Sequence, residues 1–251
     1  MESSAAPTSV SYMPSFSAMF ILIYLFAYFG IFRHWSPKQR PEASSCFISL
    51  CHGTPAVFMA LFALLSQPHH SFAAPNTNLQ NLVLDFSIAY FFVDLLHYLI
   101  FYQDDFLYIA HHLATLFVIV TCRYLVFHGA FPLLILLCIA EITSACQNTW
   151  TLASTRRADV PAADRLYHFL SPPFYAFYTA ARCFAGPLFV YKMCVFFLSK
   201  EAATVIPLWI SIPWMVVIVA ATSVSILWVS NHWMELYKES WESGGENKMK
   251  R

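Results

Sequence analysis

Long apolar stretches alternate with short polar segments along almost the whole chain. A helix needs about 20 apolar residues to cross the hydrocarbon core of a bilayer. Because an isolated apolar stretch in lipid must satisfy its own backbone hydrogen bonds, the pattern predicts an all-α polytopic bundle of transmembrane helices. The seven predicted spans are Phe16–Phe32, Ser45–Leu65, Leu79–Phe101, Leu107–Val126, Ala130–Leu152, Pro173–Leu198 and Val205–Ser230.

The composition agrees with this pattern and excludes an ordinary soluble domain. Hydrophobic residues make up 59% of the 251 residues and charged residues only 11%, against roughly 45–50% and 25% in soluble chains. The 14 Lys and Arg balance the 14 Asp and Glu. Since this leaves no basic field to hold nucleic acid, we expect membrane lipids and not nucleic acid as partners.

Basic residues gather in the loops on one side of the predicted bundle. If the seven spans alternate, one side receives Arg33, Lys38, Arg40, Arg156, Arg157, Arg165, Lys238, Lys248, Lys250 and Arg251. The other side receives only Arg123, Lys192 and Lys200. The positive-inside rule then predicts a cytosolic C-terminus and a lumenal N-terminus. The first span is predicted as a retained anchor, because no Lys or Arg precedes it.

Three parts are expected along the chain. Residues 1–39 hold an N-terminal tail, the first span and a basic loop, and residues 40–237 form a membrane domain of about six helices. Residues 238–251 form a polar, glycine-containing cytosolic tail that we expect to be disordered. The seven cysteines include no C-x-x-C pair, so neither a disulfide framework nor a zinc site is expected from them.

Polar and ionisable side chains inside the predicted spans are the candidate functional residues, because such groups are costly in lipid. Tyr90, Asp94 and His97 share one stripe of the third span, at i, i+4 and i+7. Asp85 lies about half a turn away, and we expect it to point elsewhere or to belong to the end of the span. Other such residues on the second, fourth, fifth and sixth spans are Ser49, His52, His111, His112, Thr115, Glu141, Ser144, Asn148 and Arg182.

A metal site is one interpretation of these residues. Asp94, His97 and His111 have side chains that zinc accepts as ligands. The histidine spacings of di-iron membrane enzymes are missing, however, because no histidine stands two or three positions before the pair His111–His112. We therefore expect no metal.

Acid–base chemistry and a purely structural network are the other two interpretations. In the first, His111 or His112 acts as base or nucleophile while Asp94 orients its imidazole. In the second, Arg182 and His97 pair with the intramembrane carboxylates and only hold the helices together. For the adjacent histidines we favour a functional role, because neighbouring helical positions point about 100° apart and one partner cannot satisfy both.

Five motifs in order resemble those of the TLC-domain proteins, the TRAM–LAG1–CLN8 group. They are Ser49-Leu-Cys-His52 (S-x-x-H), Tyr90-Phe-Phe-Val-Asp94 (Y-x-x-x-D), His111-His-Leu-Ala-Thr115 (H-H-x-x-T), Glu141-Ile-Thr-Ser-Ala-Cys-Gln-Asn148 (E-I-[ST]-[ST]-P-F-x-N without its Pro and Phe) and Arg182-Cys-Phe-Ala-Gly-Pro187 (R-x-x-x-G-P). The resemblance runs from about Arg40 to Tyr237.

This resemblance implies a multi-pass fold of the endoplasmic reticulum type, with helices around a lipid-accessible cavity. Its best-understood branch, the ceramide synthases, acylates a sphingoid amine with fatty acyl-CoA and requires paired histidines, which correspond to His111 and His112. The H-D-x-x-D segment that follows in ceramide synthases is absent here, where residues 131–140 are apolar and Glu141 alone is acidic. The chain is therefore closer to the short TLC-domain branch.

The resemblance favours a lipid-handling protein of the endoplasmic reticulum or Golgi that regulates or senses membrane lipid composition. One alternative is an N-acyltransferase that uses His111 and His112, with Asp94, and takes acyl-CoA as co-substrate without a bound cofactor. A second alternative is a non-enzymatic helper for secretory cargo or membrane insertion, and a homo-oligomer is left open. Residues expected to line the lipid cavity are Ser49, His52, Tyr90, His97, Thr115, Glu141, Asn148 and Arg182.

Overall fold

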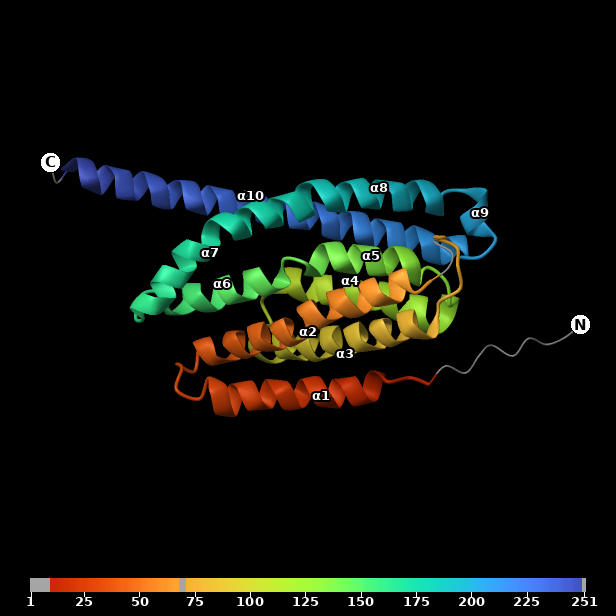
Figure 1. Cartoon of the computed structure of the whole chain (residues 1–251), viewed down its shortest axis with the longest axis horizontal. Coiled ribbons are helices and arrows are strands. Elements are labelled where there is room, and N and C mark those ends of the chain that lie inside the picture. The colour runs from red at the N-terminus through yellow and green to blue at the C-terminus, as the bar shows by residue number, and fades with distance from the viewer. Residues whose placement is uncertain (1–9, 68–70, 250–251) are drawn as a thin grey trace, which may run out of the picture.

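The computed structural model describes residues 10–67 and 71–249, in which long helices lie side by side along one common direction (Figure 1). This part of the chain holds seven helical segments that are long and apolar enough to cross a membrane. They are Met13–Ile31, Gln39–Leu65, Asn78–Phe101, Phe106–Val126, Ala130–Arg156, Pro161–Phe197 and Leu208–Lys238. The predicted all-α polytopic bundle is thereby confirmed.

Several spans consist of more than one helical element. The elements are α1 (Met13–Phe26), η1 (Ala27–Ile31), α2 (Gln39–Leu65), α3 (Asn78–Phe101), α4 (Phe106–Thr121), η2 (Cys122–Val126), α5 (Ala130–Glu141), α6 (Ser144–Arg156), α7 (Pro161–Thr179), η3 (Ala180–Ala185), α8 (Gly186–Phe197), α9 (Lys200–Ala203) and α10 (Leu208–Met249). The three η elements are π-helical turns, which are rare and occur frequently at functional sites.

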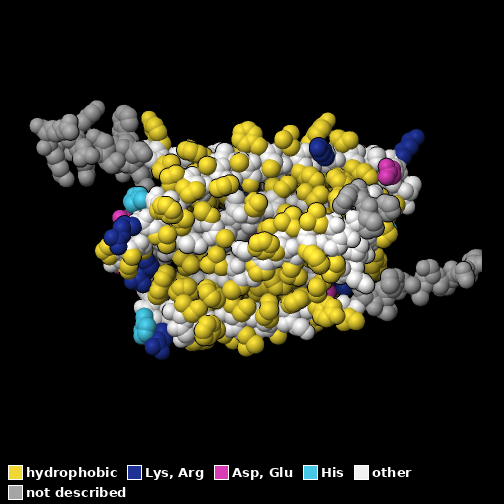
Figure 2. Space-filling model, in the orientation of Figure 1, with side chains coloured by type: hydrophobic (Ala, Val, Ile, Leu, Met, Phe, Trp, Pro, Cys, Tyr) yellow, Lys and Arg dark blue, Asp and Glu magenta, His cyan; other side chains and the backbone are white. Residues whose placement is uncertain are grey.

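The outer surface of the bundle is apolar between two charged ends. Hydrophobic side chains cover the visible middle of the molecule, whereas Lys, Arg and His side chains gather toward its ends (Figure 2). Large side chains such as Phe62 on α2, Phe177 on α7 and Val216 on α10 are more than 60% exposed. An exposed apolar belt of this extent is suited to lipid, and the chain is an integral multi-pass membrane protein.

Helix α3 is the most enclosed of the seven spans. In its most apolar 18-residue window, 72% of the residues are buried. A capping box starts the helix: the Gln80 N–H donates to Thr77 Oγ1 at 3.2 Å, and the Thr77 N–H donates to Gln80 Oε1 at 2.9 Å. Because α3 also carries Asp85 and Asp94, its polar groups lie in the interior and not against lipid.

The sixth and seventh spans differ from their predicted limits. Helix α7 begins at Pro161, so Pro172 and Pro173 lie inside a helix, whereas the sixth span was predicted to start at Pro173. Neighbouring helices can satisfy the carbonyl groups that proline leaves unpaired, which makes interior proline tolerable in a membrane bundle. Helix α10 continues to Met249, through the segment predicted as a disordered tail. No proline follows Pro213 in this helix, and residues 234–239 are mostly strong helix formers.

A buried ion pair joins α3 to η2 near one end of the bundle. Arg123, which the sequence places near the end of the fourth span, is 1% exposed. Its Nε and Nη2 atoms donate to the two Asp85 carboxylate oxygens at 2.9 and 3.3 Å. The Tyr124 hydroxyl and the Tyr12 backbone N–H donate to the same carboxylate at 2.8 and 2.9 Å. Asp85 therefore ties the segment before α1 to α3 and η2.

Candidate functional site

A buried hydrogen-bonded group forms where α2, α3 and α4 meet. His112 Nε2 lies 2.9 Å from Asp94 Oδ2, and the Ser45 hydroxyl donates to Asp94 Oδ1 at 2.7 Å. His112 Nδ1 donates to the Tyr108 carbonyl oxygen at 2.8 Å, because a carbonyl can only accept. Both ring nitrogens of His112 are therefore occupied, and through Asp94 the group holds three helices together.

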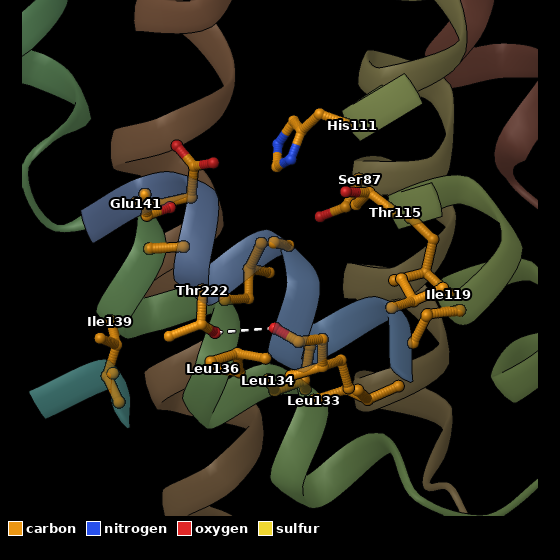
Figure 3. A pocket seen from close by; sticks show the side chains of 18 of the residues that line it. Ser87, His111, Thr115, Ile119, Leu133, Leu134, Leu136, Ile139, Glu141 and Thr222 are labelled. Atoms are coloured by element: carbon orange, nitrogen blue, oxygen red, sulfur yellow. Dashed lines mark hydrogen bonds between the residues drawn. The ribbon is translucent and has the colours of Figure 1, made fainter. Parts of the chain in front are cut away.

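His111, the adjacent histidine, has a different environment. Its half-buried ring packs against Phe91 and Trp228, with centroids 6.5 and 6.2 Å away. Its imidazole makes no hydrogen bond to any of the described residues, and it projects into open space inside the bundle (Figure 3). Of the two histidines, His111 is the one whose nitrogen atoms can exchange a proton with a bound molecule.

Two chambers meet at His111. The polar chamber has a volume of about 330 Å³ and lies toward the bundle end that carries the loop between α1 and α2. The apolar chamber has a volume of about 170 Å³ and lies deeper in the bundle. The residues that line both chambers form a neck between them: Phe91, His111, Ala140, Glu141 and Arg182.

The lining changes from polar to apolar across this neck. In Figure 3, His111 and Glu141 face the space from opposite sides, and leucine and isoleucine side chains enclose the region beyond them. Ser87 and Thr115 add two hydroxyl groups just below the neck. The two chambers together form an amphipathic cavity.

Helix α4 spans the full depth of this cavity. Asp105 caps its start by accepting a hydrogen bond from the Tyr108 N–H at 3.4 Å, and it lines the outer part of the polar chamber, which we term the mouth. His111 follows at the neck, and Ile119 lies in the apolar chamber. At about 1.5 Å per residue, the distance from Asp105 to Ile119 along the helix is about 21 Å.

Arg182 reaches the neck from the π-helical turn η3. Its Nη2 donates to the Ala140 carbonyl oxygen at 2.8 Å, and its Nη1 donates to Ser225 Oγ at 3.5 Å. Its guanidinium carbon lies 5.3 Å from the centre of the Tyr178 ring. The Nε atom is buried and has no hydrogen-bond partner among the described residues. This guanidinium can therefore bind an anionic group of a ligand.

Glu141 lies beside a break in the fifth span. Helix α5 ends at Glu141 and α6 begins at Ser144, whereas the sequence predicts one continuous helix. Helix α2 approaches this break closely at Gly53, where an added Cβ would lie 2.5 Å from Ser144 Oγ, and 2.7 Å from both Ser144 Cβ and Glu141 Oε2. Only glycine fits against the break without displacing these atoms.

We expect Gly53→Ala to cost about 1–3 kcal/mol of stability, the range for overpacking a filled interior. The added methyl group would push the Glu141 carboxylate out of its position at the neck. Thermal unfolding of the purified protein in detergent measures the loss. Gly30→Ala is the matched control, because its new Cβ would lie 3.4 Å from the Phe26 ring, an ordinary contact distance. Equal melting temperatures for the two variants would contradict the prediction.

Most of the residues expected to line a lipid cavity lie around the polar chamber. They are Ser49, Tyr90, His97, Glu141, Asn148 and Arg182, together with Asp94 and both histidines of the pair. Ser49 is hydrogen-bonded to Tyr90, and His97 Nδ1 lies 2.9 Å from the Tyr24 hydroxyl. The Asn148 amide donates to the Ser144 carbonyl oxygen at 2.9 Å.

Two of the expected lining residues are placed differently. Thr115 lines the apolar chamber instead of the polar one. His52 is 0% exposed and lies outside both linings. Its ring stacks on Tyr90 at 4.0 Å between centroids, and its Nε2 lies 3.1 Å from Ser87 Oγ. His52 therefore supports the cavity wall from behind.

An aromatic wall of the polar chamber was missed by the sequence analysis. Tyr108 stacks on Tyr98 and on Trp228, with ring centroids 5.1 Å apart in both pairs. Tyr98 lies one turn after Asp94, and Tyr108 lies one turn before His112, so helical spacing could have found both tyrosines. Trp228 comes from α10, which is distant in sequence, and no local pattern points to it.

Metal ligands do not converge in the described ranges 10–67 and 71–249. No three His, Cys, Asp or Glu side chains in them are grouped so as to hold a metal ion. The site instead has a neck between the polar and the apolar chamber. This neck carries one imidazole, one carboxylate and one guanidinium group that can form hydrogen bonds with a ligand.

Comparison with known proteins extends the likeness beyond single motifs. A TLC-domain family model, which covers TRAM, LAG1 and CLN8 proteins, matches residues 42–234. The chain is also 54% identical over 233 residues to the TLC domain-containing protein At5g14285 of Arabidopsis thaliana. That alignment covers 92% of each of the two chains, so the similarity includes the helices that build both chambers.

Proposed function

The chain belongs to the TLC-domain family of membrane proteins, and on this basis we propose that it handles membrane lipids by binding one amphiphilic lipid in its cavity. The observation that carries this proposal is the change of lining at the neck, from a chamber of tyrosine, carboxylate and amide side chains to one of leucine, isoleucine and valine side chains. A lipid has the same division between headgroup and chain.

The energetics of the site favour an amphiphile over a purely apolar molecule. A hydrocarbon chain gains little by leaving the bilayer for an apolar pocket, because lipid tails are as apolar as the pocket walls. Polar groups at the neck, in contrast, are costly inside the membrane unless a partner satisfies them. A headgroup that bonds to His111, Glu141 or Arg182 would supply such a partner.

Occupancy of such a cavity would follow the abundance of its lipid in the surrounding bilayer by mass action. We therefore propose that the protein regulates or senses membrane lipid composition and contributes to lipid homeostasis. The charge distribution of the loops supports a lumenal N-terminus and a cytosolic C-terminus, in the endoplasmic reticulum or the Golgi.

Filling the apolar chamber tests this proposal. Ala221 on α10 lines the chamber, and we expect Ala221→Trp to reduce lipid binding at least about tenfold because the indole would occupy the space of the chain. Native mass spectrometry of the purified protein measures the fraction that carries lipid. Lipidomics of membranes that contain the variant measures the effect on composition.

Ala220→Trp is the matched control for this experiment. Ala220 precedes Ala221 in the same helix but is exposed on the outer surface. A tryptophan at this position adds the same side chain to α10 without entering the cavity. Retention of lipid by both variants, or loss from both, would contradict binding in the apolar chamber.

Acyl transfer is a second candidate function, and the unbonded imidazole of His111 at the neck favours it. In this reaction the amine or hydroxyl group of an acceptor lipid would attack the thioester carbonyl of a fatty acyl-CoA. The new C–N or C–O bond would form as the C–S bond breaks, the acceptor proton would pass to His111, and the CoA thiolate would leave.

A further inference from the structure

Charged groups follow a definite order along the cavity, and from this order we propose that the bound lipid is zwitterionic. Its cationic amine lies near the mouth, its phosphate lies at Arg182 in the neck, and a single chain extends into the apolar chamber. The inference rests on the proposed function and specifies the chemistry of the headgroup.

Two carboxylates without a cationic partner in the lining make the outer part of the polar chamber acidic. Glu42 and Asp105 line only this chamber, whereas Glu141 lies in the neck together with Arg182. The fourth carboxylate of the lining, Asp94, is already paired with His112 at 2.9 Å. The one Lys or Arg among the lining residues is Arg182, so a cation that enters the mouth meets an excess of negative charge.

Aromatic rings next to these carboxylates add a second preference for a cation. Tyr98, Tyr108 and Trp228 form a continuous stack along the wall, and Tyr102 lies near the mouth. Tyr and Trp rings attract an ammonium group through their electron-rich faces, and such walls recognise choline-type headgroups. Carboxylates beside stacked rings are thus suited to a primary or quaternary amine.

The neck provides the complementary site for an anion. Arg182 directs two of its nitrogens to protein oxygens, but its Nε remains without a hydrogen bond from the described residues. His111 lies at the same level and is also unbonded there. A phosphate oxygen could accept hydrogen bonds from the guanidinium and, where the imidazole carries a proton on the facing nitrogen, from His111.

Other headgroups fit this order less well. A purely anionic headgroup at Arg182 would leave Glu42 and Asp105 without a cation, and a purely cationic one would leave Arg182 without an anion. The apolar chamber, at about 170 Å³, is also below the roughly 300–1,000 Å³ of sites for drug-sized ligands. It is therefore suited to one chain and not to the two chains of a diacyl lipid.

Four amphiphiles with the same dodecyl chain test the proposal: dodecylphosphocholine, dodecyltrimethylammonium, dodecyl phosphate and dodecyl maltoside. The full-length protein is titrated with each below its micellar concentration in lipid nanodiscs, and bound adducts are counted by native mass spectrometry. We expect dodecylphosphocholine to bind at least about tenfold more tightly than the other three, which corresponds to about 1.4 kcal/mol.

Two variants assign this preference to the proposed groups. Arg182→Gln is expected to lower dodecylphosphocholine binding to the level of dodecyltrimethylammonium and to leave the latter unchanged. The double variant Glu42→Gln, Asp105→Asn is expected to weaken the binding of both amphiphiles that carry an ammonium group, while asparagine still caps α4. Lys192→Gln is the control, because Lys192 is exposed in the middle of α8 and lies outside both linings.

The outcomes separate the headgroup proposal from the proposed function. Equal binding of all four amphiphiles, or tightest binding of dodecyl phosphate, would overturn the zwitterionic headgroup, while the lipid cavity would stand if Ala221→Trp abolished the binding. If no amphiphile binds in a way that Ala221→Trp alters, the lipid cavity itself is contradicted.

Discussion

Replacing Arg123 with leucine is expected to destabilise the protein by about 3–5 kcal/mol, the typical cost of leaving a buried charge without its partner. Asp85 is 0% exposed, and two of its hydrogen bonds come from this guanidinium. The remaining donors, Tyr124 and Tyr12, carry no charge that could compensate the carboxylate. Thermal unfolding in detergent should show an earlier transition than that of the wild-type protein.

The double variant Arg123→Leu, Asp85→Leu provides the internal control. Replacing both partners of a buried pair with apolar residues is often neutral, so much of the lost stability should return. Lys192→Leu, on an exposed position, should melt like the wild-type protein. If Arg123→Leu alone melts at the wild-type temperature, the ion pair does not hold this end of the bundle.

His111→Ala and His112→Ala are expected to have separate effects. His112→Ala removes one of the two hydrogen-bonding partners of the Asp94 carboxylate and should lower stability by about 3 kcal/mol or more. His111→Ala breaks no hydrogen bond to the described part of the chain and should leave stability close to that of the wild-type protein.

Activity, measured on folded protein, should show the opposite order, with the larger loss in His111→Ala and the smaller loss in His112→Ala. If the protein transfers acyl groups, His111→Ala should lower the rate about 10²–10⁴-fold, the usual contribution of a general base. Lipid profiles of membranes with each variant, measured beside the thermal unfolding, distinguish the two roles. A stable but inactive His112→Ala would reverse the assignment, and unchanged acyl profiles in both variants would remove acyl transfer from consideration.

Hydropathy was sufficient to predict the seven spans, because in lipid the backbone leaves few alternatives to a helix. It did not identify Arg123 as an interior residue, because it places this arginine near the end of the fourth span, among the few basic residues of that side. The π-helical turn η2 forms the end of the fourth span and brings this arginine to Asp85. A buried arginine is acceptable there only because its partner comes from α3, and no local pattern contains that information.

The sequence predicted which residues belong to the candidate site, but it did not predict the separate role of each one. Helical spacing indicates that His111 and His112 point in different directions, yet it does not say which one faces Asp94. That answer depends on how α4 is rotated against α3, which is reflected in contacts between these two helices such as the stacking of Tyr108 on Tyr98. The contributions of Trp228 and Gly53 likewise come from helices that are distant in sequence.

The depth of the cavity has a consequence for the two leaflets of the membrane. From its mouth near Asp105 it extends about 21 Å along α4, whereas the hydrocarbon core is about 30 Å thick. Beyond Ile119, the Trp214 side chain, 0% exposed, fills the interior and donates a hydrogen bond to Thr121 at 2.8 Å. A lipid headgroup that entered at the mouth would therefore meet a closed floor, so the proposed cavity would exchange lipid with one leaflet without carrying it to the other.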